Sequence, residues 1–375
     1  MPLLREAQRN GAKVVVIDPR RTLTARSADL HIAPKPATDA ALALGMMHVL
    51  FRDNLHDAAW LDANTIGWSG LRDRAMAWSP ERAADETGVP AAQIEELARL
   101  YATTKPAMLK LADGINRHLS GDQTSRTLMC LPAIAGQIGQ RGGGLFYSQS
   151  GHIRWNFEAV SHASDCPVPK RAVNMNRLGS ALKGEGADPP IMALYVFGAN
   201  PATSAPNSNL IREGLLRSDL FTVVHEQFMT DTARFADIVL PATTQLEQTD
   251  LIKPYGHQHL QYNQPAIAPL GEAKSNWTVM KLLAEAMGFD EPWLRQSSDE
   301  VIEEVLTATA KTNPRLAGIT LADLQARGTI PYAPDPDNEV PFADGVFPTP
   351  SGKLEIYSAQ LVSEDHDPLP DYVHS

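Results

Sequence analysis

The chain has 375 residues, of which 43% are hydrophobic and 21% charged, a composition ordinary for a globular enzyme and long enough for two or three domains. Its formal net charge of −11 argues against a nucleic-acid binder or a membrane-surface binder, because both need a basic field. No apolar run reaches the roughly 18–20 residues of a membrane-spanning helix, so direct membrane insertion is not expected.

The two cysteines, Cys130 and Cys166, lie far apart and form no CxxC pattern. They are most simply interpreted as free thiols in a reducing compartment, or they carry no information about the compartment. No signal peptide is recognised, which favours the cytoplasm. A periplasmic location stays open, because the chain begins as though inside a helix of a larger domain.

Two strands and a helix open the first predicted unit. Residues 13–17 form a β-branched run typical of a strand buried on both faces of a parallel sheet, and Pro19 stops it. A short strand is predicted at 29–33, and Thr38 or Asp39 caps an apolar helix over 40–51. Further helices are predicted at 56–64, 70–77, 90–104 and 121–138, with a buried strand at 106–111 before the last of them.

The second predicted unit runs from about residue 190 to 288. Its expected strands lie at 191–197, 220–225 and 236–240, and its expected helices at 207–217 and 275–287. The intervening residues 145–185 lack a clear period and predict a long ordered excursion over a site. Two amphipathic helices and a Pro/Asp-rich connector come after residue 290.

The predicted fold class is therefore α/β, with two pseudo-symmetric, open, mostly parallel sheets flanked by helices. The first α/β domain would comprise residues 1–185 and the second 186–290. Residues 291–375 would form a helical segment and connector.

Acidic residues follow a strand in each predicted unit, where open α/β sheets bind ligands. Asp18 can accept hydrogen bonds from a ribose diol or a guanine edge, or it can simply break the strand and cap the next turn. Arg20 can reach a phosphate, or it can be a solvated residue. Glu226 occupies in the second unit the place that Asp18 has in the first.

Gly198 and Asn200 come after the first strand of the second unit. A glycine there lets the backbone approach a ligand, and asparagine offers a donor and an acceptor. A structural Gly-Ala-Asn-Pro turn is the alternative. Since no GxGxxG motif is present, an NAD-type site is improbable.

Two further segments are less specific. Gly142 and Gly143 suit either a hinge or a close approach to a cofactor. Glu247, Asp250, His257 and His259 fall in a short segment, but they lack the spacing of a supported metal site, so a solvated or cofactor-lining loop is preferred and no metal ligand is assigned.

Several stretches in a fixed order resemble the molybdopterin oxidoreductases of the dimethyl sulfoxide reductase superfamily. These are Val16-Ile-Asp18-Pro-Arg-Arg, Pro36-Ala-Thr-Asp39, Ile134-Ala-Gly136-Gln-Ile-Gly139-Gln-Arg-Gly142-Gly-Gly144, Gly198-Ala-Asn200-Pro201, Phe228-Met-Thr230-Asp-Thr-Ala233 and Pro348-Thr-Pro-Ser-Gly-Lys-Leu-Glu-Ile-Tyr357. The resemblance covers nearly the whole chain.

The resemblance implies a bis(molybdopterin guanine dinucleotide) cofactor with molybdenum or tungsten, each domain holding one guanosine end. Asp18 and Asp39 would recognise one guanosine, and Gly198, Asn200, Glu226 and Thr230 would line the other. The reaction would be a two-electron oxidation or reduction of a small substrate, with electrons passing to an iron–sulfur or other electron-transfer subunit.

The departures from the family pattern also carry expectations. The cysteines of a [4Fe–4S] cluster and the residue that ligates the metal are expected upstream of this chain, and a β-barrel domain downstream. The chain would then be the middle of an enzyme about twice as long and would turn over little by itself. Arg171 and Arg177 match a formate-oxidising arginine imperfectly, so formate is not the favoured substrate.

Two other functions compete with this interpretation. The chain can be a non-catalytic electron-transfer or scaffold subunit of the same fold, as in the large peripheral subunit of respiratory NADH dehydrogenase. An NAD-dependent dehydrogenase is the weaker third possibility.

Overall fold

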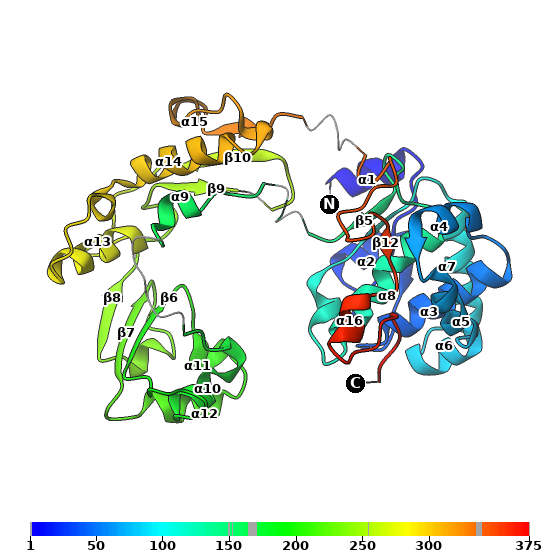
Figure 1. The fold of residues 1–375 in the computed structure, drawn as a ribbon, viewed down its shortest axis with the longest axis horizontal. Helices are drawn as coiled ribbons and strands as arrows, with labels where there is room; N and C mark the ends of the chain where they lie inside the picture. The colour runs from blue at the N-terminus through cyan, green and yellow to red at the C-terminus, as the bar shows by residue number, and fades with distance from the viewer. Residues whose placement is uncertain are drawn as a thin grey trace. The chain divides into compact units, whose positions relative to one another are not determined.

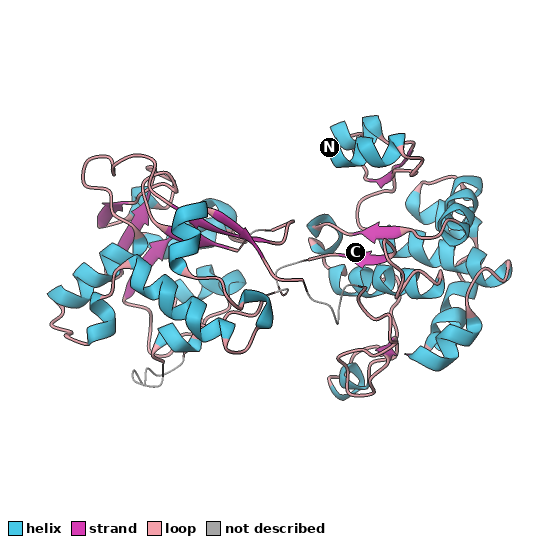
Figure 2. Ribbon diagram, turned by 90° about the horizontal axis from the view of Figure 1, so that it is seen from above, coloured by secondary structure: helices cyan, strands magenta, loops and turns pink. Residues whose placement is uncertain are grey.

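The computed structural model describes residues 2–148, 151, 153–163, 171–253, 255–334 and 340–374. The chain divides into two compact units, which Figure 1 shows in ribbon form. Unit 1 comprises Met1–Gln149 and Asp335–Ser375, and unit 2 comprises Ser150–Pro334. Both are mixtures of helices and short strands, as Figure 2 shows, and the α/β class is confirmed.

The elements of unit 1 succeed one another along the chain. They are α1 (Pro2–Arg9), β1 (Val15–Ile17), α2 (Leu23–Ser27), β2 (Leu30–Ile32), α3 (Asp39–Arg52), α4 (Ala58–Asn64), β3 (Thr65–Ile66), α5 (Trp68–Met76), α6 (Pro80–Thr87), α7 (Ala91–Thr103), β4 (Met108–Lys110), the 3-10 helix η1 (Asp113–Asn116), α8 (Gly121–Ile134), β5 (Gly144–Phe146), β12 (Leu354–Glu355) and α16 (Ala359–Ser363). Helix α6 was not predicted, and its Ser79 cap and its Pro80 at the first turn are the signals that could have shown it.

Helix α3 forms the centre of unit 1. Its residues from Ala40 to Phe51 are all buried, because the helix is apolar around its whole circumference. Gly45 lets Ala83 of α6 approach so closely that a Cβ on residue 45 would lie 2.6 Å from the Ala83 Cβ. Helices α5, α6, α7 and α8 pack around α3 and fix the position of its N-terminus.

The strands of unit 1 form separate parallel pairs. β1 pairs with β2, with Val15 opposite Leu30, and β4 pairs with β5. The prediction that residues 13–17 and 106–111 are buried strands was wrong: Ile17 is 37% exposed and Met108 is 57% exposed. Each strand has a single partner in the described part of the chain, so part of its surface stays open.

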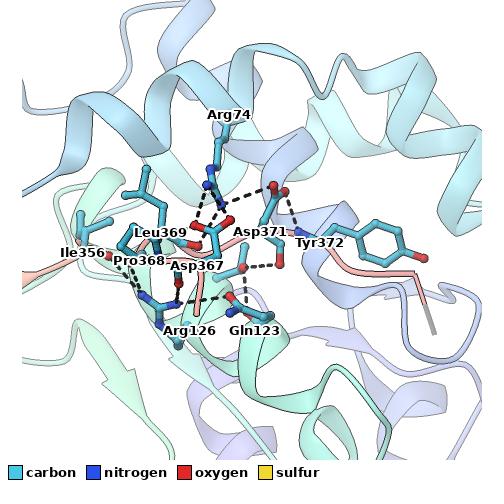
Figure 3. Close-up of polar contacts among 10 residues, drawn as sticks. Arg74, Gln123, Arg126, Ile356, Asp367, Pro368, Leu369, Asp371 and Tyr372 are labelled. Carbon is cyan, nitrogen blue, oxygen red and sulfur yellow. Dashed lines mark hydrogen bonds and ion pairs between the residues drawn. The ribbon is translucent and has the colours of Figure 1, made fainter. Parts of the chain in front are cut away.

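The segment from β12 to residue 374 packs against the helices of unit 1. β12 pairs in parallel with β3, and two arginines bind the chain beyond it. Arg74 donates to both carboxylate oxygens of Asp367 at 2.7 and 2.8 Å, and Arg126 donates to the carbonyl of Pro368 at 2.7 Å (Figure 3). This segment, predicted to share a region with the helices after residue 290, belongs to unit 1 instead.

Unit 2 contains the remaining elements. They are α9 (Glu158–Ser161), η2 (Met175–Arg177), α10 (Leu178–Leu182), β6 (Ala193–Phe197), α11 (Pro201–Ser204), α12 (Ser208–Leu215), β7 (Phe221–Glu226), η3 (Ala233–Phe235), β8 (Ile238–Pro241), β9 (Asp250–Ile252), β10 (His259–Asn263), α13 (Asn276–Ala286), η4 (Pro292–Arg295), α14 (Ser298–Ala310), η5 (Pro314–Leu316), α15 (Leu321–Arg327) and β11 (Thr329–Pro331).

Two sheets organise unit 2. Strands β6, β7 and β8 form a parallel sheet in that order, as predicted, and α10, α11 and α12 lie beside it in Figure 1. An unpredicted antiparallel sheet has the order β11–β10–β9, and α14 and α15 pack on it. Residues 291–375 are thus divided between the two units, because these helices cover a sheet of unit 2 and β12 pairs within unit 1.

Among the described residues, no helix is both long enough and apolar enough to cross a membrane.

Candidate functional site

Asp18 lies directly after β1, at the carboxyl end of the β1–β2 pair. The Arg20 backbone N–H donates to Asp18 Oδ1 at 2.7 Å, and the His31 ring lies 2.8 Å from the Asp18 carbonyl oxygen. The turn therefore fixes the carboxylate through one of its oxygens, and Oδ2 has no hydrogen-bond partner among the residues that the structure describes. The Arg20 side chain is exposed beside it.

Asp39 is the second acidic residue near this end of unit 1. It begins α3, whose N-terminus favours negative charge. Thr38 is the N-cap residue, but it does not form the predicted side-chain cap, because its hydroxyl donates to the Lys35 carbonyl at 2.7 Å instead. Burial raises the pKa of Asp39, the charge of Asp18 raises it further, and His118 opposes the rise. These groups are therefore electrostatic neighbours.

His118 was missed by sequence reasoning. It lies in the turn between η1 and α8, and its Nε2 atom is buried without a hydrogen-bond partner in the described part of the chain. Its only sequence signal is its place just ahead of a helix, which is too common to have identified it.

Glu226 is the last residue of β7, in the parallel sheet of unit 2. Its Oε1 accepts a hydrogen bond from the Gln227 backbone N–H at 2.6 Å, so one oxygen is again held by the adjoining turn. Gly198 comes directly after the neighbouring strand β6 with a φ of +60°, and a Cβ there would meet no described atom within 4 Å. The backbone at Gly198 is thus open to close approach.

The loops after β6 and β7 are bound together by hydrogen bonds. Asn200 Oδ1 accepts from the backbone N–H and the hydroxyl of Thr232, at 3.2 and 2.6 Å. The Thr232 hydroxyl in turn accepts from the Ala202 backbone N–H at 3.1 Å. Asn200, predicted as a cofactor ligand, therefore has a structural role through its oxygen and keeps only its amide nitrogen for a ligand.

An eight-residue sequence occurs in both units, directly after the two carboxylate turns. It reads Thr22-Leu-Thr-Ala-Arg-Ser-Ala-Asp29 in unit 1 and Thr230-Asp-Thr-Ala-Arg-Phe-Ala-Asp237 in unit 2, with two differences. Asp18 stands four residues before the first copy and Glu226 four residues before the second. This repeat is the sequence signal that shows the two carboxylates to be equivalent.

The two copies also fold alike. Thr22 Oγ1 accepts from the Ala25 backbone N–H at 3.2 Å, and Thr230 Oγ1 accepts from the Ala233 backbone N–H at 3.2 Å. Thr22 therefore caps α2, and Thr230 closes the equivalent turn at the start of η3. The Thr230 hydroxyl oxygen accepts this bond, and the cofactor role of Thr230 stays a prediction.

The glycine-rich turn packs against its own unit. A Cβ on Gly143 would lie 2.6 Å from the Gln137 carbonyl oxygen, and one on Gly142 would lie 3.4 Å from Pro106. The buried Gln137 side chain donates to the carbonyls of Tyr101 and Thr104 and accepts from the Ala107 N–H. These contacts give the glycines a packing role, and a cofactor role for Gly142 and Gly143 stays a prediction.

The acidic and histidine-containing loop of unit 2 has local roles. Glu247 accepts from the Thr244 N–H and hydroxyl and from the Leu270 N–H, and these bonds lower its pKa. No cluster of three or more potential metal-ligating side chains occurs among the residues that the structure describes.

The two arginines considered for formate have other places in unit 2. Arg171 donates to the Pro189 carbonyl and Arg177 ends η2. Cys166 lies outside the described residues.

Apart from Gly142 and Gly143, the predicted site residues therefore form two groups, one in each unit. Asp18, Arg20 and Asp39 lie together at the carboxyl end of β1 and the start of α3. Glu226, Gly198, Asn200 and Thr230 lie together at the carboxyl ends of β6 and β7. Each group presents a turn-held carboxylate on an α/β scaffold, the arrangement in which such folds bind nucleotides.

The chain is similar to known proteins along nearly its whole length. A family model described as molybdopterin oxidoreductase matches residues 1–286. The chain is 42% identical over 371 residues to the probable oxidoreductase YoaE of Bacillus subtilis (strain 168), covering 99% of this chain and 53% of that protein. It is 30% identical over 383 residues to the F420-dependent formate dehydrogenase 1 subunit alpha of Methanococcus maripaludis, covering 96% and 55%.

A solved structure shows the same fold. Acetylene hydratase from Pelobacter acetylenicus superposes with a TM-score of 0.77 at 26% sequence identity, covering 99% of this chain and 55% of that one. The chain thus spans about half the length of the curated relatives it matches. The family model, the relatives and the shared fold agree, and the chain belongs to the molybdopterin oxidoreductase family.

Proposed function

We propose that this chain supplies the two guanosine-binding halves of an oxidoreductase that uses bis(molybdopterin guanine dinucleotide) with molybdenum or tungsten. The whole enzyme would oxidise or reduce a small substrate by two electrons, through oxo transfer or a formate-type reaction. The repeated carboxylate turn carries the proposal, because a cofactor with two identical nucleotide ends needs two equivalent binding loops.

The residues present fit such a cofactor. Family members are oxidoreductases with a molybdopterin cofactor, which supplies the two-electron redox chemistry when it is bound. Asp18 and Glu226 each keep one carboxylate oxygen for a ribose hydroxyl or a guanine N–H. Gly198 leaves room for a phosphate against the backbone, and Arg20 can neutralise one.

A non-catalytic electron-transfer or scaffold subunit is the second candidate, and one observation favours it. Asn200 binds Thr232 within the protein, so a scaffold would need this asparagine as much as a cofactor-binding enzyme would. The φ of +60° at Gly198 favours glycine in either candidate, but the space beside its backbone, where a Cβ would meet no described atom within 4 Å, leaves room for the phosphate that the enzyme would bind.

Pterin retention distinguishes the two candidates. The chain would be produced in a host that makes the cofactor, and the purified protein extracted for fluorescent oxidised pterin and released guanosine monophosphate. We expect both from the wild type and less of both from Asp18→Ala and Glu226→Ala. Asp290→Ala and Glu185→Ala, which alter exposed acids elsewhere, serve as matched controls.

A wild-type protein without pterin or guanosine would support the scaffold. Wild-type amounts in both carboxylate variants would show that Asp18 and Glu226 are turn residues without a cofactor role. An iron–sulfur or other electron-transfer subunit as partner is part of the same proposal, and co-purification with a cluster-containing protein tests it.

A further inference from the structure

The two carboxylate turns differ in the residues between the carboxylate and the repeated sequence. Pro19, Arg20 and Arg21 separate Asp18 from Thr22 in unit 1. Gln227, Phe228 and Met229 separate Glu226 from Thr230 in unit 2. The shared register places Arg20 opposite Phe228 and Arg21 opposite Met229, so a pair of cations in one loop corresponds to a pair of large apolar side chains in the other.

Phe228 and Met229 are exposed although they lie in a well-bonded loop. Phe228 is 73% exposed and Met229 is 60% exposed. The loop backbone around them is held by hydrogen bonds, since the Thr230 N–H donates to the Phe228 carbonyl at 2.8 Å and the Thr230 hydroxyl accepts from the Ala233 N–H at 3.2 Å. An aromatic ring held by a rigid backbone and left open beside a carboxylate offers a stacking surface to a base whose edge the carboxylate can bind.

The neighbouring strand contributes to the same apolar edge. Phe197 ends β6, pairs in register with His225 and is 51% exposed. In unit 1, the turn after β1 carries instead the exposed Arg20 and Arg21. The carboxyl edge of the unit 2 sheet is therefore apolar where the matching edge of unit 1 is cationic.

We propose that the two loops bind the same guanosine nucleotide by different chemistry. In unit 1, Arg20 forms an ion pair with the phosphate, and in unit 2, Phe228 stacks on the guanine base. The inference rests on the proposed function and adds to it a binding residue, Phe228, and a difference in salt sensitivity. An ion pair at an exposed site weakens as salt screens it, whereas stacking does not depend on charge.

Guanosine monophosphate binding to the full chain tests this difference, with equilibrium dialysis as the readout. Glu226→Ala serves as the background that leaves the unit 1 loop intact, and Asp18→Ala as the background that leaves the unit 2 loop intact. In each background the affinity is measured at about 50 and about 300 mM sodium chloride, which shortens the screening length by more than twofold.

In the Asp18→Ala background, we expect Phe228→Ala to weaken binding by about tenfold at both salt concentrations, the size of one lost base–aromatic contact. Phe221→Ala, at the opposite end of β7 and 50% exposed, is the matched control and should leave the affinity unchanged. In the Glu226→Ala background, Arg20→Ala should weaken binding at low salt and abolish most of the salt dependence. Arg72→Ala, an exposed arginine of α5, should change neither.

Equal affinities for Phe228→Ala and Phe221→Ala would overturn the role of Phe228, and an unchanged salt dependence in Arg20→Ala would overturn that of Arg20. Failure of the proposed function has a different signature. In that case the wild type binds no guanosine monophosphate, or neither carboxylate substitution reduces the amount bound.

Discussion

Asp29 and Asp237 make the same pair of hydrogen bonds in the two units. Asp29 Oδ2 accepts from the Val14 backbone N–H at 2.8 Å, and Asp237 Oδ2 accepts from the Thr222 backbone N–H at 2.6 Å. In return the Asp29 N–H donates to the Val14 carbonyl and the Asp237 N–H to the Thr222 carbonyl. Each aspartate therefore aligns the starts of two paired strands. This alignment also positions the carboxylate turn, which lies at the other end of the same strand pair.

We expect Asp29→Ala and Asp237→Ala to lower the melting temperature, each by loosening one strand pair. Each substitution removes the acceptor of a backbone N–H at the start of a strand. Thermal unfolding measured by circular dichroism reports the effect, with Asp290→Ala as the control because Asp290 is an exposed loop residue. Melting temperatures equal to that of the control would show that these bonds do not stabilise the strand pairs.

The contribution of Asp29 also depends on pH. The Val14 N–H, and to a smaller extent the Gln8 side chain, holds the pKa of Asp29 below its ordinary value of 3.8. A group with a lowered folded-state pKa stabilises the protein above its unfolded-state pKa, and this stabilisation is lost as the pH falls through the folded-state value. The difference in melting temperature between wild type and Asp29→Ala should therefore shrink on acidification below 3.8.

The local sequence predicted the boundaries of strands and helices better than it predicted which elements pack against them. The ends of β1 before Asp18 and of β7 at Glu226, and the start of α12 after Asn207, could be inferred from prolines, apolar runs and polar residues. The exposure of β1 and β4 could not be inferred, because a largely apolar run looks the same in the sequence whether its strand gains one neighbour or two. The antiparallel sheet was missed since β9 and β11 are three residues each, too short for a period to show.

The sequence predicted where the site residues lie in the fold, but not which hydrogen bonds they make. Sequence reasoning identified Asp18, Glu226 and Gly198 as strand-end residues. It assigned Asn200 and Thr230 to the cofactor, which stays a prediction, and it did not foresee that their oxygens accept hydrogen bonds from Thr232 and Ala233. The hydrogen-bond partner of a side-chain oxygen depends on which loops meet in the fold, and a single sequence does not show which loops meet. A repeated sequence is an exception, because the copies that begin at Thr22 and Thr230 indicate that the two turns form the same local bonds.

Arg126 binds the segment beyond β12 and should be needed for its attachment. It donates to the carbonyls of Pro368, Ile356 and Asp367, and these oxygens would lose a charged donor in Arg126→Met (Figure 3). Because a hydrogen bond to a charged group contributes about 1.5–3 kcal/mol, we expect the free energy of unfolding to fall by about that amount. Urea denaturation measures it, and Arg72→Met is the control for an exposed arginine.

The ion pair between Arg74 and Asp367 makes the attachment of the same segment sensitive to acid. Hydrogen bonding by Arg74 holds the pKa of Asp367 below its ordinary value of 3.8. The pair therefore stabilises the segment above that pH and releases it as the pH falls through the lowered folded-state pKa. We expect amide exchange in residues 354–372, corrected for its intrinsic rate, to accelerate on acidification in the wild type. Asp367→Asn should exchange faster already at neutral pH and respond less to acid, and an identical acid response in both proteins would contradict the role of this carboxylate.

Gly143 and Gly114 provide a matched test of the glycine-rich turn. A methyl group on Gly143 would lie 2.6 Å from the Gln137 carbonyl oxygen, whereas one on Gly114 would meet no described atom within 4 Å. Overpacking against fixed backbone costs about 1–3 kcal/mol, so Gly143→Ala should lower the free energy of unfolding by that amount and Gly114→Ala should not. Equal unfolding free energies for Gly143→Ala and Gly114→Ala would show that the turn shifts to accommodate the methyl group and that Gln137 does not fix its position.

Cys130 should be inert in the folded protein and reactive in the unfolded one. It lies on α8 in the core of unit 1, and burial raises the pKa of its thiol to about 12. At pH about 8 the thiolate fraction is then on the order of one in ten thousand, and the packed helices also exclude the reagent. We expect iodoacetamide to leave the Cys130 peptide unmodified under native conditions and to alkylate it fully in guanidinium chloride. Peptide mapping by mass spectrometry reads Cys130 separately from Cys166, and rapid native alkylation at Cys130 would show that α8 opens away from α3.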